Sequence, residues 1–143
     1  MTLLAAEIDH FVNRLTSQHD GLLGECESHE NLSSTQEHIL MLLGETPELT
    51  NSELASTLHI TPAATTKALK KLQTGGLLAS TRNVTDARRV EFTLTEKARP
   101  IALEHASHHQ KTLGAYQELL VHFTENEQKT IQKFLSALTE VRQ

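Results

Sequence analysis

The apolar residues of this chain recur mostly every three or four positions, which is the spacing of helices with one buried face. This spacing predicts a first helix over about 3–18 and a last helix over 125–141. The segment 16–32 is polar and contains two glycines, which indicates a helix end followed by a loop. Both ends of the chain are therefore expected to be helical.

Capping sequences predict where the inner helices begin. A hydroxyl residue is followed three positions later by Glu or Gln at Ser33, Ser34, Thr50, Thr93 and Thr124. Such pairs satisfy the free N–H groups of a first helical turn. Thr61 stands before Pro62, and a proline at the first helical position costs no hydrogen bond. The predicted inner helices run from 33 to 44, over 51–58, from Pro62 to Gly75, and over 95–122 with a bend near Pro100.

Between the last two of these helices the apolar period changes from helical to alternating. Residues 77–94 alternate on both sides of the turn sequence "NVTDA", which predicts a β-hairpin. Two short helices joined by a tight turn and followed by a hairpin form a winged helix-turn-helix. This DNA-reading unit is predicted over about 33–94.

The fold class that follows is mainly α with a small β-hairpin wing, in one domain spanning 1–143. The apolar stripes at the two chain ends exceed what the small winged core can cover. Helices over about 3–18 and 105–141 are therefore expected to form a helical dimerisation region that pairs with a second copy. Packing within one chain remains the alternative.

The distribution of charge supports a DNA partner. The chain has a net charge of −5, yet residues 61–99 hold eight basic and three acidic side chains. A local basic surface in an acidic protein is typical of one face that meets an anion. On the helix after Pro62, the small and basic residues share one face and the apolar ones the other. The predicted DNA contacts are Pro62, Ala63, Thr66, Lys67, Lys70, Lys71, Arg82, Arg88 and Arg89. The alternative is that these basic residues only solvate an outer surface.

A second chemistry is indicated by nine histidines among 143 residues, three of them within "EHASHHQ" at 104–110. On a helix, His105 and His109 fall within the apolar arc, so both imidazoles are expected to face inward. A buried imidazole needs a hydrogen-bond partner or a metal. Zinc takes about four ligands, so other segments must contribute.

The predicted helix from residue 33 carries the adjacent pair Glu37 and His38. Neighbouring helical residues diverge by about 100° and so suit two ions rather than one. This predicts a nitrogen-rich site of His38, His105 and His109, and a carboxylate-rich site of Glu37 and Glu104. The loop 19–30 offers the completing ligands Asp20, Glu25, Cys26, Glu27, His29 and Glu30. Three of these candidate ligands have a simpler alternative role: Glu37 as a helix cap, His38 as a core histidine, and Cys26 as a small buried hydrophobe.

Several classes of protein are disfavoured. No apolar run approaches the roughly 18 residues of a membrane span, and the N-terminus lacks the features of a secretory signal. A single cysteine, Cys26, rules out an internal disulfide and fits a reducing cytoplasm. An enzyme is not expected, since no H-E-x-x-H motif is present, and neither is an organic cofactor. Sensing of oxidation by Cys26 is the competing function, but Glu25 and Glu27 should raise the pKa of its thiol.

The stretches "LSSTQEHILMLL", "NSELASTLHITPAATTKALKKLQTGGLL" and "DARRVEFTLT" resemble a MarR-family repressor. Together with "EH…HH" and the upstream cysteine, they are similar to the zinc-responsive AdcR/ZitR branch over essentially the whole chain. The resemblance implies a homodimer with two zinc ions per protomer, loaded with zinc when it binds the operators of zinc-uptake genes. It implies a primary site of Asp20, His38, His105 and His109, and a secondary site of Cys26, Glu37 and Glu104. The family usually has Glu at the position of Asp20.

Overall fold

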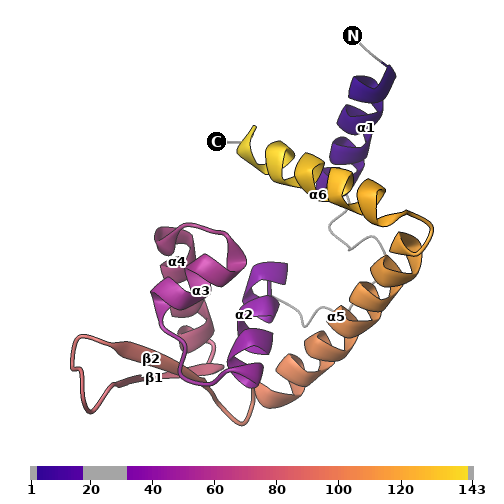
Figure 1. The fold of residues 1–143 in the computed structure, drawn as a ribbon. Helices are drawn as coiled ribbons and strands as arrows, with labels where there is room; N and C mark the ends of the chain where they lie inside the picture. The colour runs from indigo at the N-terminus through magenta and orange to yellow at the C-terminus, as the bar shows by residue number, and fades with distance from the viewer. Residues whose placement is uncertain (1–2, 18–31, 142–143) are drawn as a thin grey trace. The chain divides into compact units, whose positions relative to one another are not determined.

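The computed structural model describes residues 3–17 and 32–141 and divides into two compact units, Met1–His108 and His109–Gln143. The elements in chain order are α1 (Leu3–Ser17), α2 (Ser34–Glu45), α3 (Asn51–Leu58), α4 (Pro62–Thr74), β1 (Leu78–Arg82), β2 (Val90–Leu94), α5 (Arg99–Leu120) and α6 (Glu125–Glu140). Figure 1 shows α2, α3 and α4 grouped beside the β1–β2 hairpin. The predicted mainly helical fold with a hairpin wing is confirmed. The predicted loop ligands, Asp20 and Cys26 among them, lie outside the described residues.

Most of the predicted helix starts agree with the structure. Ser33, Thr50 and Thr124 each form a reciprocal capping box, and Thr61 caps α4 ahead of Pro62. At α2 the cap is Ser33, whose hydroxyl accepts from the Gln36 N–H while the Gln36 side chain accepts from the Ser33 N–H. The capping box of α2 is therefore complete without Glu37, so the carboxylate of Glu37 can take another role.

The predicted start of the long helix is wrong. Thr93 does not cap a helix, because it lies in β2 opposite Ala79. The hydroxyl of Thr95 donates instead to the carbonyl oxygen of Gly76 at 2.8 Å. The α5 helix begins four residues later than predicted, at Arg99, which places Pro100 in its first turn. A proline there removes no helical hydrogen bond, so no bend is required.

The wing is a two-stranded antiparallel sheet in which Leu78 pairs with Leu94 and Arg82 with Val90. A short bridge extends it, because the Phe92 N–H donates to the Leu49 carbonyl oxygen in the loop between α2 and α3. The wing is thus joined to the helical part through backbone hydrogen bonds as well as through its apolar side chains.

One apolar core holds the winged unit together. Its largest fully buried apolar side chains come from α2, α3 and α4, and they are Ile39, Leu40, Leu43, Leu54, Leu69 and Leu72. On α4 the four predicted inward residues Thr65, Ala68, Leu69 and Leu72 are all buried. Each fully buried leucine contributes about 1.5–3 kcal/mol through the hydrophobic effect. The core fixes which face of α4 remains exposed.

The helices at the two chain ends, α1 and α6, differ from the winged unit because their apolar side chains are largely exposed. No residue of α6 is buried, and its apolar stripe leaves Phe134 43% and Leu135 54% exposed. On α1, Leu4 is 64% and Phe11 49% exposed. No helix among the residues with described placement is long and apolar enough to cross a membrane. The exposed stripes are those that the sequence assigned to a dimerisation region.

The loop between α2 and α3 contains a conformation that suits glycine better than its actual residue. Glu48 is exposed and has a φ of 68°, in the left-handed region. Because a side chain there costs about 1–2 kcal/mol, part of it offset by the backbone entropy of glycine, Glu48→Gly should stabilise the protein by up to about 1 kcal/mol. Urea unfolding measures this. Glu45→Gly, in the last turn of α2, should instead lower the free energy of unfolding by a similar amount. Equal losses of stability in the two variants would contradict the prediction.

Candidate functional site

Two imidazoles and a carboxylate from α2 and α5 meet inside the first unit. We call Glu37, His38 and His105 the α2–α5 cluster. The Nε2 atom of His105 lies 3.5 Å from Nδ1 of His38, and the two rings are close to perpendicular, with centroids 5.3 Å apart and an interplanar angle of 72°. On the other side of the ring, Nδ1 of His105 lies 3.5 Å from Oε2 of Glu37. The cluster joins residues that are far apart in the sequence.

The surroundings of the cluster are largely dry. The side chains of His105 and Glu37 are only 12% and 6% exposed. A carboxylate beside one ring nitrogen of a histidine holds the proton on that nitrogen and leaves a lone pair on the other. In that tautomer the Nε2 lone pair of His105 faces Nδ1 of His38, and a positive ion could be held between the two nitrogens.

The spacing of these nitrogens fits zinc. With Zn–N distances of about 2.0–2.1 Å and tetrahedral angles, two ligating nitrogens are about 3.3 Å apart. The observed separation of 3.5 Å matches this value closely. Neutral imidazole nitrogen is also a ligand that zinc prefers. The donor types and their separation therefore suit two ligands of one zinc ion.

The other predicted ligands are placed as follows. Glu104 precedes His105 on α5 and is half-buried. His109 begins the second unit, and Asp20 and Cys26 lie outside the described residues. Among the residues that the structure describes, no group of three or more His, Cys, Asp or Glu side chains is arranged to hold a metal ion. The structure thus brings Glu37, His38 and His105 together, while the full ligand sets stay predictions.

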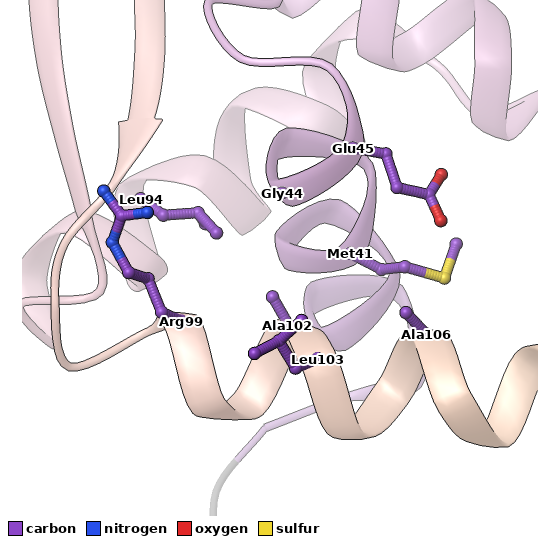
Figure 2. Close-up of a pocket in the computed structure, with 8 residues that line it drawn as sticks. All are labelled: Met41, Gly44, Glu45, Leu94, Arg99, Ala102, Leu103 and Ala106. Atoms are coloured by element: carbon purple, nitrogen blue, oxygen red, sulfur yellow. The ribbon is translucent and has the colours of Figure 1, made fainter.

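A second region of the α2–α5 contact is mostly apolar, with Glu45 and Arg99 among its lining residues. A cavity of about 190 Å³ lies here. Figure 2 shows the residues that line it, which are Met41, Gly44, Glu45, Leu94, Arg99, Ala102, Leu103 and Ala106. A Cβ atom added at Gly44 would lie 3.5 Å from the side chain of Ala102. This is an ordinary van der Waals distance, so α2 and α5 are in contact here and the space at Gly44 would also admit a Cβ atom. None of the residues lining this cavity is a predicted metal ligand, so the cavity and the α2–α5 cluster are separate features of one helix contact.

The opposite face of α4 carries the predicted DNA contacts. Pro62, Ala63, Thr66, Lys67, Lys70 and Lys71 are all exposed, as the helical projection predicts. The hydroxyl of Thr66 donates to the Pro62 carbonyl oxygen at 2.9 Å and accepts from Nδ2 of Asn51 at 2.6 Å. Its only proton is therefore engaged within the protein. What Thr66 can offer to a base is its methyl group and a remaining lone pair.

The three predicted arginine contacts lie on the wing and differ in their surroundings. Arg82 is exposed at the end of β1. The Arg88 N–H donates to Oδ1 of Asp86, which shapes the hairpin tip. The guanidinium of Arg89 instead forms ion pairs with Glu53 and Glu91, both at 2.9 Å. Arg88 and Arg89 are adjacent in sequence, but of their two guanidinium groups only that of Arg89 forms ion pairs with the described residues.

Sequence reasoning missed Asn51 and Glu91 and assigned Glu53 only to a helix cap. Asn51 contacts Thr66 across fifteen residues, and no periodic pattern signals such a contact. Glu91 is an acid on an alternating strand, yet it is 7% exposed. Strand alternation puts Glu91 on the face opposite the core residue Phe92, so no pattern in the sequence signals that its carboxylate is buried.

Comparison with known proteins decides the family. The model of the MarR family matches residues 32–90. The chain is also 54% identical over 141 residues to the transcriptional regulator ZitR of Lactococcus lactis subsp. cremoris, with 96% of this chain and 97% of that protein covered. This chain belongs to the MarR family. The predicted resemblance is thereby confirmed.

Solved structures of this MarR-family relative agree with the fold. A zinc-responsive MarR family member, Lactococcus lactis ZitR, has a TM-score of 0.73 at 51% identity and covers 98% of this chain and 99% of its own. Wild-type Lactococcus lactis ZitR in complex with DNA has a TM-score of 0.77 at 54% identity, with 100% and 99% covered. The MarR family and its relatives are transcriptional regulators, so this chain is a regulator and not an enzyme.

Proposed function

We propose that this protein is a cytoplasmic, zinc-dependent transcriptional repressor. It binds operator DNA as a homodimer when zinc-loaded and controls zinc-uptake genes. The observation that carries the proposal is the separation of 3.5 Å between the ring nitrogens of His38 and His105, on two different helices. It is supported by the similarity to a zinc-responsive relative and to a relative solved with DNA.

Two zinc sites per protomer are proposed. The primary site takes Asp20, His38, His105 and His109, and the secondary site takes Cys26, Glu37 and Glu104. Bound zinc supplies a positive charge that ligands from separate segments share. His38 and His105 present nitrogen lone pairs at a suitable separation, and Glu37 lies beside the second nitrogen of His105. Glu37 can therefore orient the ring of His105 in addition to acting as a ligand of the secondary site.

The α2–α5 cluster lies between the DNA-reading unit and the long helix. His38 belongs to α2, whose buried residues Ile39, Leu40 and Leu43 are part of the winged core. His105 belongs to α5, which continues into the second unit. Holding both imidazoles on one ion therefore restrains α5 against the DNA-reading unit. If this restrained form binds DNA better, linkage requires DNA to tighten zinc binding by the same factor.

The homodimer is supported by the exposed apolar stripes of α1 and α6. One winged unit reads only a few base pairs, and a two-fold axis lets two units read two half-sites. A second copy would cover Phe11, Phe134 and Leu135, which the single chain leaves between 43% and 54% exposed.

The proposal is tested by DNA binding of the wild-type protein with and without zinc. The probe is the tightest duplex that the zinc-loaded protein selects from a random library. We expect affinity to rise about 5- to 150-fold between a chelator and micromolar zinc, the range of typical allosteric couplings. Magnesium at the same concentration serves as the control and should have no effect. Equal affinity in chelator and in zinc would exclude a zinc-dependent repressor.

A further inference from the structure

The side chain of Arg89 connects the wing to the first turn of α3. Its Nη2 atom lies 2.9 Å and 3.3 Å from the two carboxylate oxygens of Glu53, and its Nε atom lies 2.9 Å from Oε1 of Glu91. The same oxygen of Glu91 accepts from Nδ2 of Asn83, on the other side of the hairpin, at 2.6 Å. We call Glu53, Arg89 and Glu91 the wing clamp. It links the wing to α3, in addition to the apolar core and the Phe92–Leu49 backbone hydrogen bond beside it.

The carboxylate of Glu53 in the wing clamp stays charged. Hydrogen bonds, chiefly from the backbone N–H of Thr50 and also from Arg89, lower the pKa of Glu53. Glu91 is mostly buried, with a side chain 10% exposed. The guanidinium of Arg89 thus contacts two carboxyl groups, and its Nε and Nη2 donors are used within the protein. Its Nε–Nη2 edge, the one that would form a two-pronged contact with a DNA phosphate, could do so only by exchanging these partners.

Arg88 is placed differently. In the part of the chain that the structure describes, its guanidinium forms no hydrogen bond or ion pair. Arg88 lines an open hollow of about 650 Å³ together with Arg89, Val90, Phe92 and the first turn of α3. Arg89 and Glu53, which form an ion pair in the wing clamp, both line this hollow. Their ion pair therefore sets the distance between the Arg88 backbone and α3.

We propose that Arg89 does not contact DNA but is a positioning residue, which fixes the wing to α3 through Glu53 and Glu91 and so places Arg88 against the duplex. This inference rests on the proposed binding of DNA. Hairpins of two strands are marginally stable by themselves, so the angle of the wing depends on such attachments. Arg89 and Glu53 are 41% and 40% exposed, and ion pairs this exposed contribute little to folding. The wing clamp therefore acts mainly on geometry.

The variant Glu53→Gln distinguishes a DNA-contacting Arg89 from a positioning Arg89, because the two roles predict opposite changes in DNA affinity. If Arg89 contacted phosphate, removing its competing carboxylate would free the guanidinium and reduce repulsion, so DNA would bind more tightly. If Arg89 positions the wing, the same variant weakens binding although a negative charge is lost. Glutamine at this place in a capping box still accepts from the Thr50 N–H, so α3 keeps its start.

The experiment measures affinity for the selected duplex in zinc at several salt concentrations. We expect Glu53→Gln to bind roughly 3- to 10-fold more weakly than wild type, the size of a typical coupling within a charge network. Arg89→Lys should weaken binding similarly with an unchanged salt slope, because a lysine keeps the charge but cannot bridge two carboxylates. Arg88→Ala should lower the salt slope by about 0.9, the loss of one phosphate contact.

Glu48→Gln is the matched control, since it removes the same charge from an exposed loop outside the wing clamp, and it should bind at least as tightly as wild type. Urea unfolding of each variant shows whether the fold is kept. Tighter binding by Glu53→Gln than by Glu48→Gln, or wild-type affinity of Arg89→Lys, would overturn the inference and leave the proposed function intact. If the wild-type protein selects no duplex at all, both the proposed function and the inference fail.

Discussion

The variant His105→Ala should bind operator DNA in zinc no more tightly than the wild-type protein binds it in a chelator. His105 supplies the nitrogen that lies 3.5 Å from His38, and it also faces Glu37. Its removal takes one ligand from the primary site and the neighbour of Glu37 from the secondary site. The coupling between zinc and DNA, about 5- to 150-fold in affinity, should therefore be lost. Fluorescence anisotropy with the selected duplex, in chelator and in zinc, measures this directly.

His108→Ala is the control for this prediction. His108 lies on the same helix and is half-buried, but it belongs to neither predicted site. The control should keep the zinc response and the zinc content of the wild-type protein. A full zinc response in His105→Ala, with zinc content unchanged, would mean that the α2–α5 cluster has no part in sensing the metal.

The variant Leu72→Ala should lower the free energy of unfolding by about 2–5 kcal/mol. Leu72 is fully buried in α4 and belongs to the core that also contains Leu40 and Leu54. Truncation removes its hydrophobic contribution and leaves a cavity that a close-packed core fills only in part. A loss of this size is a large fraction of the stability of an ordinary domain.

Urea unfolding in the presence of a chelator measures the effect of Leu72→Ala, since bound zinc would add its own stabilisation. Lys71→Ala is the control on the neighbouring exposed position and should change the unfolding free energy by less than about 0.5 kcal/mol. A cost below about 1 kcal/mol for Leu72→Ala would show that this face of α4 is not the buried one.

The α2–α5 cluster shows how far sequence reasoning reached in the candidate site. Helical periodicity placed His105 on an inward face, and the structure describes its side chain as 12% exposed. The partner of His105 was harder to find, because His38 lies 67 residues away and a single histidine on α2 has no periodic signal. The acid–His pairs on two predicted helices nevertheless grouped His38 with His105 and Glu37 with Glu104. The resemblance to a known family selected Asp20 and Cys26 from the loop, and these two residues lie outside the described ones.

Local patterns alone determined most elements of this fold, because their causes act within about four residues. Examples are the capping boxes at Ser33, Thr50 and Thr124, the proline after Thr61 and the alternation of the wing.

Only the tertiary structure decided the start of α5, where pairing with β1 takes Thr93 away from the helix, and the partner of Arg89, which lies 36 residues away at Glu53. Strand pairing and ion pairs between distant segments depend on how the core brings those segments together. Such contacts leave no periodic trace in the sequence.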